Sequence, residues 1–196
     1  MKRLLLILIL TLSLQSWTKA DDISDFEIEG ISLGDSALDY VTKKFIDKEK
    51  YYYPASKKFV EFNIDKWNLK SFNFEIYDGV HIVFKNNDSK YIIASLRAKI
   101  YYFEDNINEC YKIKNKIISG LEELFAIKRR SDEIDPHDAD DSGNSIVDST
   151  FLYLDNGGRA AVQCYDWSVD MKKHDNLSVS ISTKEHSYWL DNEAFN

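Results

Sequence analysis

Four stretches in the first half of the chain alternate between apolar and polar residues, which is the pattern of half-buried β-strands. These stretches are residues 60–64, 72–76, 80–84 and 91–102. Asp78-Gly79 precedes the third stretch and is a two-residue hairpin signal. In the last stretch, Ser95, Arg97 and Lys99 share the polar face. The pattern predicts an antiparallel meander with one face in water.

The pattern changes to a helical period between residues 107 and 127. Apolar residues recur there every three or four positions, at Ile107, Cys110, Ile113, Ile117, Leu121 and Leu124. Asn106 and Glu109 form a capping pattern at the start of this segment. An apolar stripe of this kind needs a partner surface, so we expect the helix to pack across the sheet.

Two shorter helices are predicted near the ends of the chain. Leu38, Val41 and Phe45 fall on one helical face after a capping residue at Asp35 or Ser36. Near the C-terminus, a second capping pattern precedes a short apolar run. It comprises Ser182 and Glu185, followed by Tyr188, Trp189 and Leu190.

More strands are predicted after the long helix. Residues 151–154 and 160–165 flank an Asn-Gly-Gly turn at 156–158 and form a hairpin. Residues 177–181 alternate again, with serines at every polar position. The intervening segment 128–149 is polar and acidic, and its composition predicts a long loop.

Together these elements predict an α+β fold, in which an antiparallel β-sheet packs against the long helix at 107–127, with short N-terminal and C-terminal helices. We find no internal repeat and no domain boundary. The sequence therefore predicts a single domain over residues 21–196, with the long acidic loop at 128–149 as an insertion.

The first twenty residues have the layout of a secretory signal peptide. Met1-Lys2-Arg3 is basic, residues 4–14 are almost entirely apolar, and a small residue, Ala20, precedes the acidic start at Asp21. The apolar run is shorter than the roughly 20 residues of a spanning helix, although an uncleaved anchor is the alternative. We expect export to a periplasm or the extracellular space, with no transmembrane segment after cleavage of residues 1–20.

The net charge of the chain limits the classes of partner that we expect it to bind. The whole sequence carries 25 basic and 33 acidic residues, a net charge of −8. Without Lys2, Arg3 and Lys19, 22 basic residues remain against 33 acidic ones, which gives a net charge near −11. Such a chain repels phosphate backbones, so nucleic acid and anionic membranes are disfavoured as partners.

Only two cysteines are present, Cys110 and Cys164. The first lies on the apolar stripe of the long helix and the second on a strand face with other small apolar residues. Both therefore point towards a core, and an oxidising compartment favours their pairing. We predict a Cys110–Cys164 disulfide, with two buried free thiols as the alternative. No C-x-x-C motif indicates redox catalysis.

The acidic segment is a candidate for calcium binding, because six carboxylates fall within ten positions there. The candidate ligands are Asp138, Asp140, Ser142 and Asn144. The spacing follows a calcium loop at first, but Ser149 stands where the loop needs a bidentate Glu. The alternative is a solvated acidic loop, and no other cofactor is indicated.

Nothing in the sequence names a catalytic residue. The four histidines are His81, His137, His174 and His186, and no pair has metal-ligand spacing. No nucleophile elbow, phosphate loop or dinucleotide fingerprint is present. His81 faces away from the apolar side of its strand, so we expect it on the surface. A small secreted hydrolase whose acids or histidines converge only in the fold is one alternative function.

Aromatic residues gather in short clusters and are abundant overall, with 12 Tyr, 11 Phe and 4 Trp. Consecutive aromatic residues cannot all point inward on a strand, so part of each cluster should reach the surface. Tyr and Trp are frequent anchors of protein interfaces. The candidate interaction residues are Tyr51, Tyr52, Tyr53, Tyr101, Trp167 and Trp189.

Residues 31–41, with the sequence ISLGDSALDYV, resemble the opening of BamE-like and beta-lactamase-inhibitor-like domains, where an I-x-x-G-x-S turn starts a helix. Segments 25–40 and 164–168 are also similar to small exported bacterial proteins of unknown function. The resemblance implies export and an envelope-assembly or inhibitor-like partner. It supplies no catalytic activity.

These observations favour an exported, non-enzymatic binding or protein-interaction domain, whose partner is an envelope or secreted protein. A small secreted hydrolase and a calcium-binding exported protein are the alternatives. An open, concave sheet face carrying Tyr and Trp would favour the binding protein, and two carboxylates in a closed site would favour the hydrolase.

Overall fold

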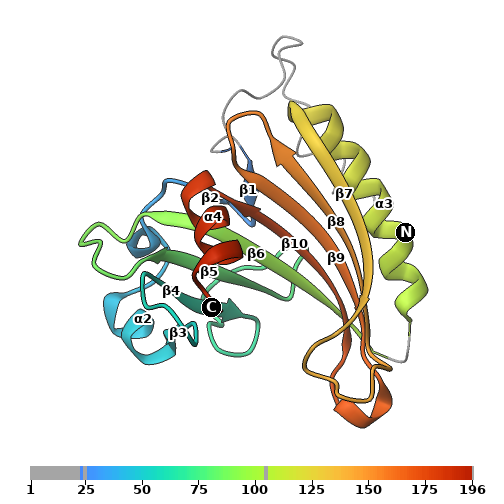
Figure 1. The fold of residues 1–196 in the computed structure, drawn as a ribbon. Helices are drawn as coiled ribbons and strands as arrows, with labels where there is room; N and C mark the ends of the chain where they lie inside the picture. The colour runs from blue at the N-terminus through green and yellow to red at the C-terminus, as the bar shows by residue number, and fades with distance from the viewer. Residues whose placement is uncertain (1–22, 24–25, 104–105, 196) are drawn as a thin grey trace.

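An eight-stranded antiparallel sheet dominates the computed structural model, which describes residues 23, 26–103 and 106–195 (Figure 1). In sheet order the strands are β3 (Tyr51–Tyr52), β4 (Phe59–Asp65), β5 (Gly79–Lys85), β6 (Ile93–Tyr102), β10 (Asp175–Ser182), β9 (Arg159–Asp166), β8 (Ile146–Leu154) and β7 (Ile127–Pro136). Every neighbouring pair is antiparallel. The pairing of β6 with β10 joins the two halves of the sheet.

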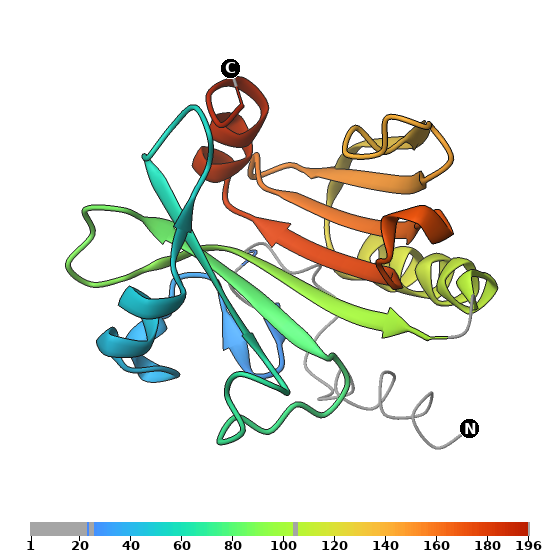
Figure 2. The same cartoon turned by 90° about the horizontal axis from the view of Figure 1, so that it is seen from below.

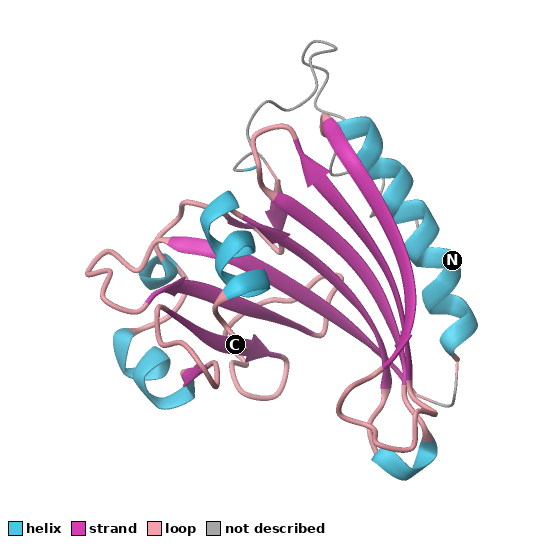
Figure 3. Cartoon of the chain, in the orientation of Figure 1, coloured by secondary structure: helices cyan, strands magenta, loops and turns pink. Residues whose placement is uncertain are grey.

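Smaller elements lie on both sides of this sheet. Strands β1 (Glu27–Ile28) and β2 (Ile31–Ser32) form a separate pair. The helical elements are η2 (Ala37–Asp39), α2 (Lys43–Glu49), α3 (Ile107–Leu124), η3 (Val169–Met171) and α4 (Lys184–Asn192). Figure 3 shows α3 behind the sheet and α4 in front of it, so the two helices belong to different packing layers.

The main core lies on one face of the sheet and extends across it. Alternate residues of six strands are buried there, namely Phe62, Ile82, Leu96, Val179, Val162 and Leu152. The N-terminal segment covers one half of this face through Ile28, Ile31 and Ile46, and α3 covers the half that contains β9 and β10. Each such side chain contributes about 1.5–3 kcal/mol when it is fully buried.

The opposite face is concave and mostly polar. Figure 2 shows both edges of the sheet bending towards the side on which α4 lies. Helix α4 covers one end of this face, where Trp189 packs with Phe59 and Val83 in a second, smaller apolar cluster. We call the sheet surface on the α4 side the concave face, and it carries the candidate site.

The predicted fold class is wrong. The expected α+β arrangement, a sheet packed against one long helix, is replaced by a mostly β structure in which eight strands form one large sheet. Helix α3 contacts only one part of one face, and the N-terminal segment covers the rest. The prediction missed strand β7 and the first part of strand β8, which follow the helix. It therefore overestimated the share of the sheet that the helix covers.

The long acidic loop predicted at 128–149 is also wrong. Strand β7 runs through Pro136 and pairs with β8, which begins at Ile146. Only residues 137–145 connect the two strands. Strand β7 lies at the edge of the sheet, where both faces of a strand accept charged side chains, so its sequence lacks the alternation of a half-buried strand.

No strand forms at 72–76 in the described part of the chain, contrary to prediction. The carboxylate of Glu29 instead accepts hydrogen bonds from the backbone N–H groups of Glu75, Ile76 and Tyr77, at 2.8, 2.8 and 2.6 Å. Strand β4 pairs directly with β5, so Asp78-Gly79 is not the turn of a two-residue hairpin. A side chain satisfies the backbone donors that a neighbouring strand would otherwise have satisfied.

Several predicted elements are confirmed. The long helix is α3, the hairpin around 156–158 joins β8 to β9, and the serine-rich strand is β10. The C-terminal helix is α4, and its cap is Thr183, whose hydroxyl accepts from the backbone N–H of His186. The predicted signal peptide at 1–20 lies outside the described residues. No helix in the described ranges is long and apolar enough to cross a membrane.

The two edges of the large sheet differ in length and chemistry. At one edge, β3 contains only Tyr51 and Tyr52. At the other, β7 has ten residues, most of them exposed and charged, and ends in Pro136. Neither edge is a long, flat apolar strand.

Candidate functional site

The middle of the concave face is built from three adjacent strands. In β6, Arg97 and Lys99 point to this face, and in β10 the corresponding residues are Ser178 and Ser180. Lys99 lies opposite Ser178, which in turn lies opposite Gln163 of β9. Small serines on the central strand therefore separate long cationic side chains from the side chains of β9.

We name this region the central patch. Its members share the middle of the concave face or the loop beside it, and they are Arg97, Lys99, Gln163, Tyr165, Lys173 and Ser178. The polar alternation of 91–102 predicts a wet face for Arg97 and Lys99, and the alternation of 177–181 predicts a strand. The register between these two strands, separated by some eighty residues, left no signal in the sequence.

A buried carboxylate lies next to the central patch. Glu61 of β4 is 1% exposed, and it accepts hydrogen bonds from Tyr53 Oη at 2.5 Å and from Arg97. His81 Nδ1 lies 2.7 Å from the same carboxylate. Burial alone would raise the pKa of Glu61, but the hydrogen bond from His81 and the charge of Arg97 hold that pKa well below its ordinary value. Glu61 is therefore ionised, and its carboxylate oxygens are already bonded to three side chains.

His81 is not the exposed residue that the strand pattern predicts. Its Nδ1 lies 3.2 Å from Tyr51 Oη in addition to its contact with Glu61. Burial lowers the pKa of His81, because the neighbouring strands remove water from the ring. The edge strand β3 thus supplies a tyrosine to this network and closes it on one side.

Lys99 differs from Arg97 because it has no acidic partner among the described residues. In the described ranges its ammonium group forms no ion pair or hydrogen bond, whereas Arg97 is bonded to Glu61. Burial, together with the nearby charge of Arg97, lowers the pKa of Lys99 to about 8. At neutral pH Lys99 is still mostly protonated, and its charge is uncompensated.

Ser178 is a second group with unused hydrogen-bonding capacity. It is 1% exposed, and its Oγ has no hydrogen-bond partner among the described residues. Asn176, two positions earlier on the same face of β10, has an unpaired Oδ1. Buried polar groups are usually satisfied, so unpaired ones next to an unpaired cation are candidates for contact with a ligand.

Aromatic side chains border the central patch where β9 ends. Tyr165 and Trp167 are stacked, with ring centroids 6.0 Å apart and planes inclined by 16°. His137 lies 4.4 Å from the Trp167 ring, and Lys173 Nζ lies 4.0 Å from the centroid of the same ring. Trp167 is half-buried, and its ring holds Lys173, a third cation, beside the patch.

The other aromatic candidates have different positions. Tyr51 and Tyr52 are exposed at 41% and 38%, and Tyr101 is half-buried with its ring 6.1 Å from the exposed Trp67. Tyr53 is held by Glu61. These residues lie on or beside the concave face, or on the edge strand next to it, and remain candidates for contact with a partner.

Trp189 is the exception among the predicted interaction residues. It is 0% exposed, and it packs edge-on against Tyr53 and tilted against Phe59, both at 4.9 Å between centroids. Its indole N–H donates to Ser56 Oγ. The placement of Trp189 on an interaction surface is therefore wrong, because α4 turns the indole into the second apolar cluster.

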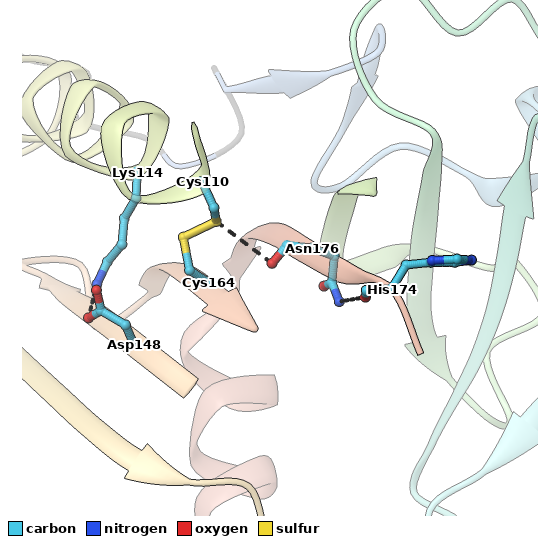
Figure 4. The surroundings of a disulfide bond; sticks show 6 residues. All are labelled: Cys110, Lys114, Asp148, Cys164, His174 and Asn176. Carbon is cyan, nitrogen blue, oxygen red and sulfur yellow. Dashed lines mark hydrogen bonds and ion pairs between the residues drawn. A yellow bond between two sulfur atoms is a disulfide. The ribbon is translucent and has the colours of Figure 1, made fainter. Parts of the chain in front are cut away.

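The predicted disulfide is confirmed. Cys110 of α3 and Cys164 of β9 are bonded, both are fully buried, and their Cα atoms are 5.9 Å apart (Figure 4). Figure 4 also shows the ammonium of Lys114 directed at the carboxylate of Asp148 on β8. A covalent bond and a nearly buried ion pair together fix α3 to the strands that carry Tyr165 and Gln163.

The acidic connection at 137–145 is organised by one carboxylate. Asp140 accepts hydrogen bonds from the hydroxyls of Ser142 and Ser145 at 2.6 Å each, and from that of Ser168 at 2.9 Å. It also accepts from the backbone N–H groups of Ser142 and Ser145. Asp138 and Asn144 are exposed and do not join it. The carboxylate therefore acts as the internal anchor of the connection.

Calcium binding at Asp138, Asp140, Ser142 and Asn144 gains no support from this geometry. Within the described residues, no three His, Cys, Asp or Glu side chains come together in a way that would hold a metal ion. Both oxygens of Asp140 already accept hydrogen bonds. Calcium binding by this connection stays a prediction.

The chemistry of the site favours binding over catalysis. The buried carboxylate beside the central patch, Glu61, is held ionised by three donors, so it is poorly suited to move a proton near neutral pH. Lys99, by contrast, has no hydrogen-bond or ion-pair partner among the described residues and could contact a ligand. Comparisons with known proteins add no family assignment, because no protein family, curated protein or solved structure matches this chain.

Proposed function

We propose that this chain is an exported, non-enzymatic binding protein that recognises a secreted or envelope protein on its concave face. The observation that carries the proposal is the composition of that face. Small serines on β10 lie between cationic side chains of β6 and aromatic side chains at the end of β9, on a sheet whose edges bend towards the same side. Strands β6, β9 and β10 position most of these groups, as a recognition surface requires.

Export is supported by two features that fit one another. The signal-like sequence at 1–20 would direct the chain to an oxidising compartment, and Cys110 and Cys164 form the disulfide that such a compartment favours. The resemblance of residues 31–41 to envelope-associated domains agrees with a partner in the same compartment.

The interaction surface combines aromatic anchors with charge. Trp167, Tyr165 and Tyr101 provide large, rigid contact areas, and residues of this type dominate the binding energy of protein interfaces. Arg129 lies 3.7 Å from the Tyr153 ring centroid, so stacked cation–aromatic pairs continue towards the β7 edge. Such pairs keep arginine at the surface in a fixed orientation.

Site-specific photo-crosslinking in the producing cells tests this proposal. A photoreactive residue at Ser180 or Tyr165 should capture one partner, and the same residue at Lys44 of α2, on the other side of the sheet, should not. The captured species should disappear when Trp167→Ala is introduced. Equal capture from Lys44, or no capture from the concave face, would contradict the proposal.

A further inference from the structure

We propose that the central patch is a binding site for an oxyanion, a carboxylate, sulfate or phosphate group that the partner displays. This inference rests on the proposed function, because it names the chemistry that the concave face recognises. It follows from the charge of the patch, from its unpaired donors and from the small side chains at its centre.

The charge of the patch is opposite to that of the chain. The protein is acidic overall, yet Arg97, Lys99 and Lys173 gather here. The nearby acid, Glu61, is already bonded to Arg97, His81 and Tyr53. Local positive charge within a low-dielectric surface attracts and retains an anion more strongly than a solvated lysine does.

The donors of the patch form a compact set. The unpaired ammonium of Lys99 and the unpaired hydroxyl of Ser178 come from residues directly opposite one another in the β6–β10 ladder. Ser178 is almost completely buried, so an oxyanion reaches its hydroxyl only when the neighbouring side chains move aside on binding. The oxyanion then accepts from both groups at once, and charge-assisted hydrogen bonds of this kind are the stronger ones.

Because Lys99 is desolvated, the patch is more stable with an anion bound than without one. Without an anion, a half-buried ammonium beside Arg97 is unfavourable, and the pKa of Lys99 lies near 8 for this reason. An oxyanion restores a counter-charge to the patch. Ser180, next to Ser178 on the same face of β10, has a short side chain and is only partly buried, so a compact group can approach the sheet there.

The alternative occupant, a purely apolar partner segment, is less compatible with these groups. It would cover Lys99 without supplying a counter-charge, which leaves a desolvated ammonium unsatisfied. An acidic group of the partner supplies that counter-charge. Tyr165 and Trp167 would then contact the remainder of the same partner at the rim of the patch.

The test uses inorganic probes on the purified, disulfide-intact protein at pH 6.5. Backbone amide NMR shifts are followed during titration with sodium sulfate, sodium phosphate and sodium acetate, with sodium chloride at matched ionic strength as the reference. We expect saturable shifts centred on Lys99, Gln163 and Ser178. Lys99→Met should weaken the anion affinity by about tenfold or more.

Two further variants make the result specific. Ser178→Ala should weaken the same binding by about threefold to tenfold, because it removes one neutral donor. Lys44→Met removes the same charge from α2 on the other side of the sheet and should leave the affinity unchanged. Thermal unfolding of each variant verifies that it is folded, and Lys173→Met replaces Lys99→Met if the latter is not.

The outcomes separate this inference from the proposed function. Anions that shift the patch no more than chloride does, or equal losses in Lys99→Met and Lys44→Met, overturn the oxyanion site. If crosslinks still map to the concave face in that case, the binding function stands without it. Anion binding without partner capture would instead contradict the protein-binding function and leave the anion site intact.

Discussion

Individual polar residues that are buried in the sheet govern its chemistry. Glu61 and Lys99 lie on the same face and are both desolvated, but only Glu61 has charged partners. Partnered and unpartnered buried charges behave in opposite ways, because pairing stabilises the charged form and isolation destabilises it. At this scale the ion pair of Glu61 supports the fold, and Lys99 is available for recognition.

Arg97→Met should destabilise the protein by about 3–5 kcal/mol, since it leaves the buried carboxylate of Glu61 without its cation. Urea unfolding at pH 7 measures the change. Arg129→Met is the matched control, because Arg129 stacks on Tyr153 near the β7 edge and forms no ion pair in the described ranges, so its loss should cost less than about 1 kcal/mol. Similar losses in both variants would refute the structural role of Arg97.

His186 should make the protein sensitive to mild acid. The ring is 2% exposed between Phe59 and Trp189, both its nitrogens lack hydrogen-bond partners among the described residues, and burial lowers its pKa to about 4. The unfolded chain binds the proton more readily, at a pKa near 6.5. The free energy of unfolding therefore falls as the pH decreases from about 6.5 to 4, by up to roughly 3 kcal/mol.

His186→Phe should reduce this acid sensitivity, because phenylalanine keeps the ring packing and cannot accept a proton. Unfolding midpoints between pH 7.5 and 4 compare the two proteins. Part of the pH dependence should remain, since burial also lowers the pKa of His81 and of His137. An unchanged pH dependence in the variant would show that His186 is not the sensitive group.

At the scale of elements, the connection between β7 and β8 shows how a polar segment can be ordered. Asp140 joins three serine hydroxyls from two separate parts of the chain, since Ser168 follows β9. The segment 137–145 is thereby tied to the loop that carries Trp167. Its order comes from one side chain and not from an apolar core.

Asp140→Ala should loosen residues 137–145 without unfolding the sheet. Hydrogen exchange of the amides of Ser142 and Ser145, which donate to this carboxylate, should become about tenfold faster or more. Asp138→Ala is the matched control, because Asp138 is exposed and forms no side-chain hydrogen bond in the described part of the chain. If both variants exchange alike, Asp140 does not anchor the connection.

The same elements show how far the sequence predicts the fold. Alternation identified β4, β5, β6 and β10, since each of these strands has one face in the main core, and the turn at 156–158 identified β9. It missed β7, because an edge strand has no buried face to impose a pattern. It also mistook 72–76 for a strand, because the backbone partner there is the distant side chain of Glu29.

The candidate site was less predictable than its strands. Ser95, Arg97 and Lys99 were assigned to a polar face correctly, and the serines of β10 alternate visibly in the sequence. The site arises only when β6 lies beside β10, and that pairing depends on long-range contacts. Among the aromatic candidates, Trp167 is half-buried beside the central patch, whereas Trp189 is buried because α4 folds back over the sheet.

At the scale of the whole molecule, one sheet is covered by two unrelated segments. The N-terminal segment covers β4 to β6, and α3 covers β9 and β10. The Cys110–Cys164 bond fastens only the second covering. Covalent attachment therefore stabilises the half of the sheet that carries Gln163 and Tyr165, at the edge of the central patch.

Replacing both cysteines by alanine should lower the free energy of unfolding by about 4 kcal/mol, if closure of a loop of 54 residues is the main effect. Urea unfolding measures the loss. The unmodified protein in excess reductant should unfold at a similarly lowered urea concentration, which serves as the control. A loss below about 1 kcal/mol would show that packing alone holds α3 on the sheet.

The two unequal edges of the large sheet limit how copies of this protein can associate. A single open sheet has backbone donors and acceptors at both ends, and such edges can recruit strands from other molecules. Here one end has only two residues, and the other presents closely spaced charges and finishes in a proline. We therefore expect crowded copies to remain separate at their edges, so that specific association is left to the broad surfaces of the sheet.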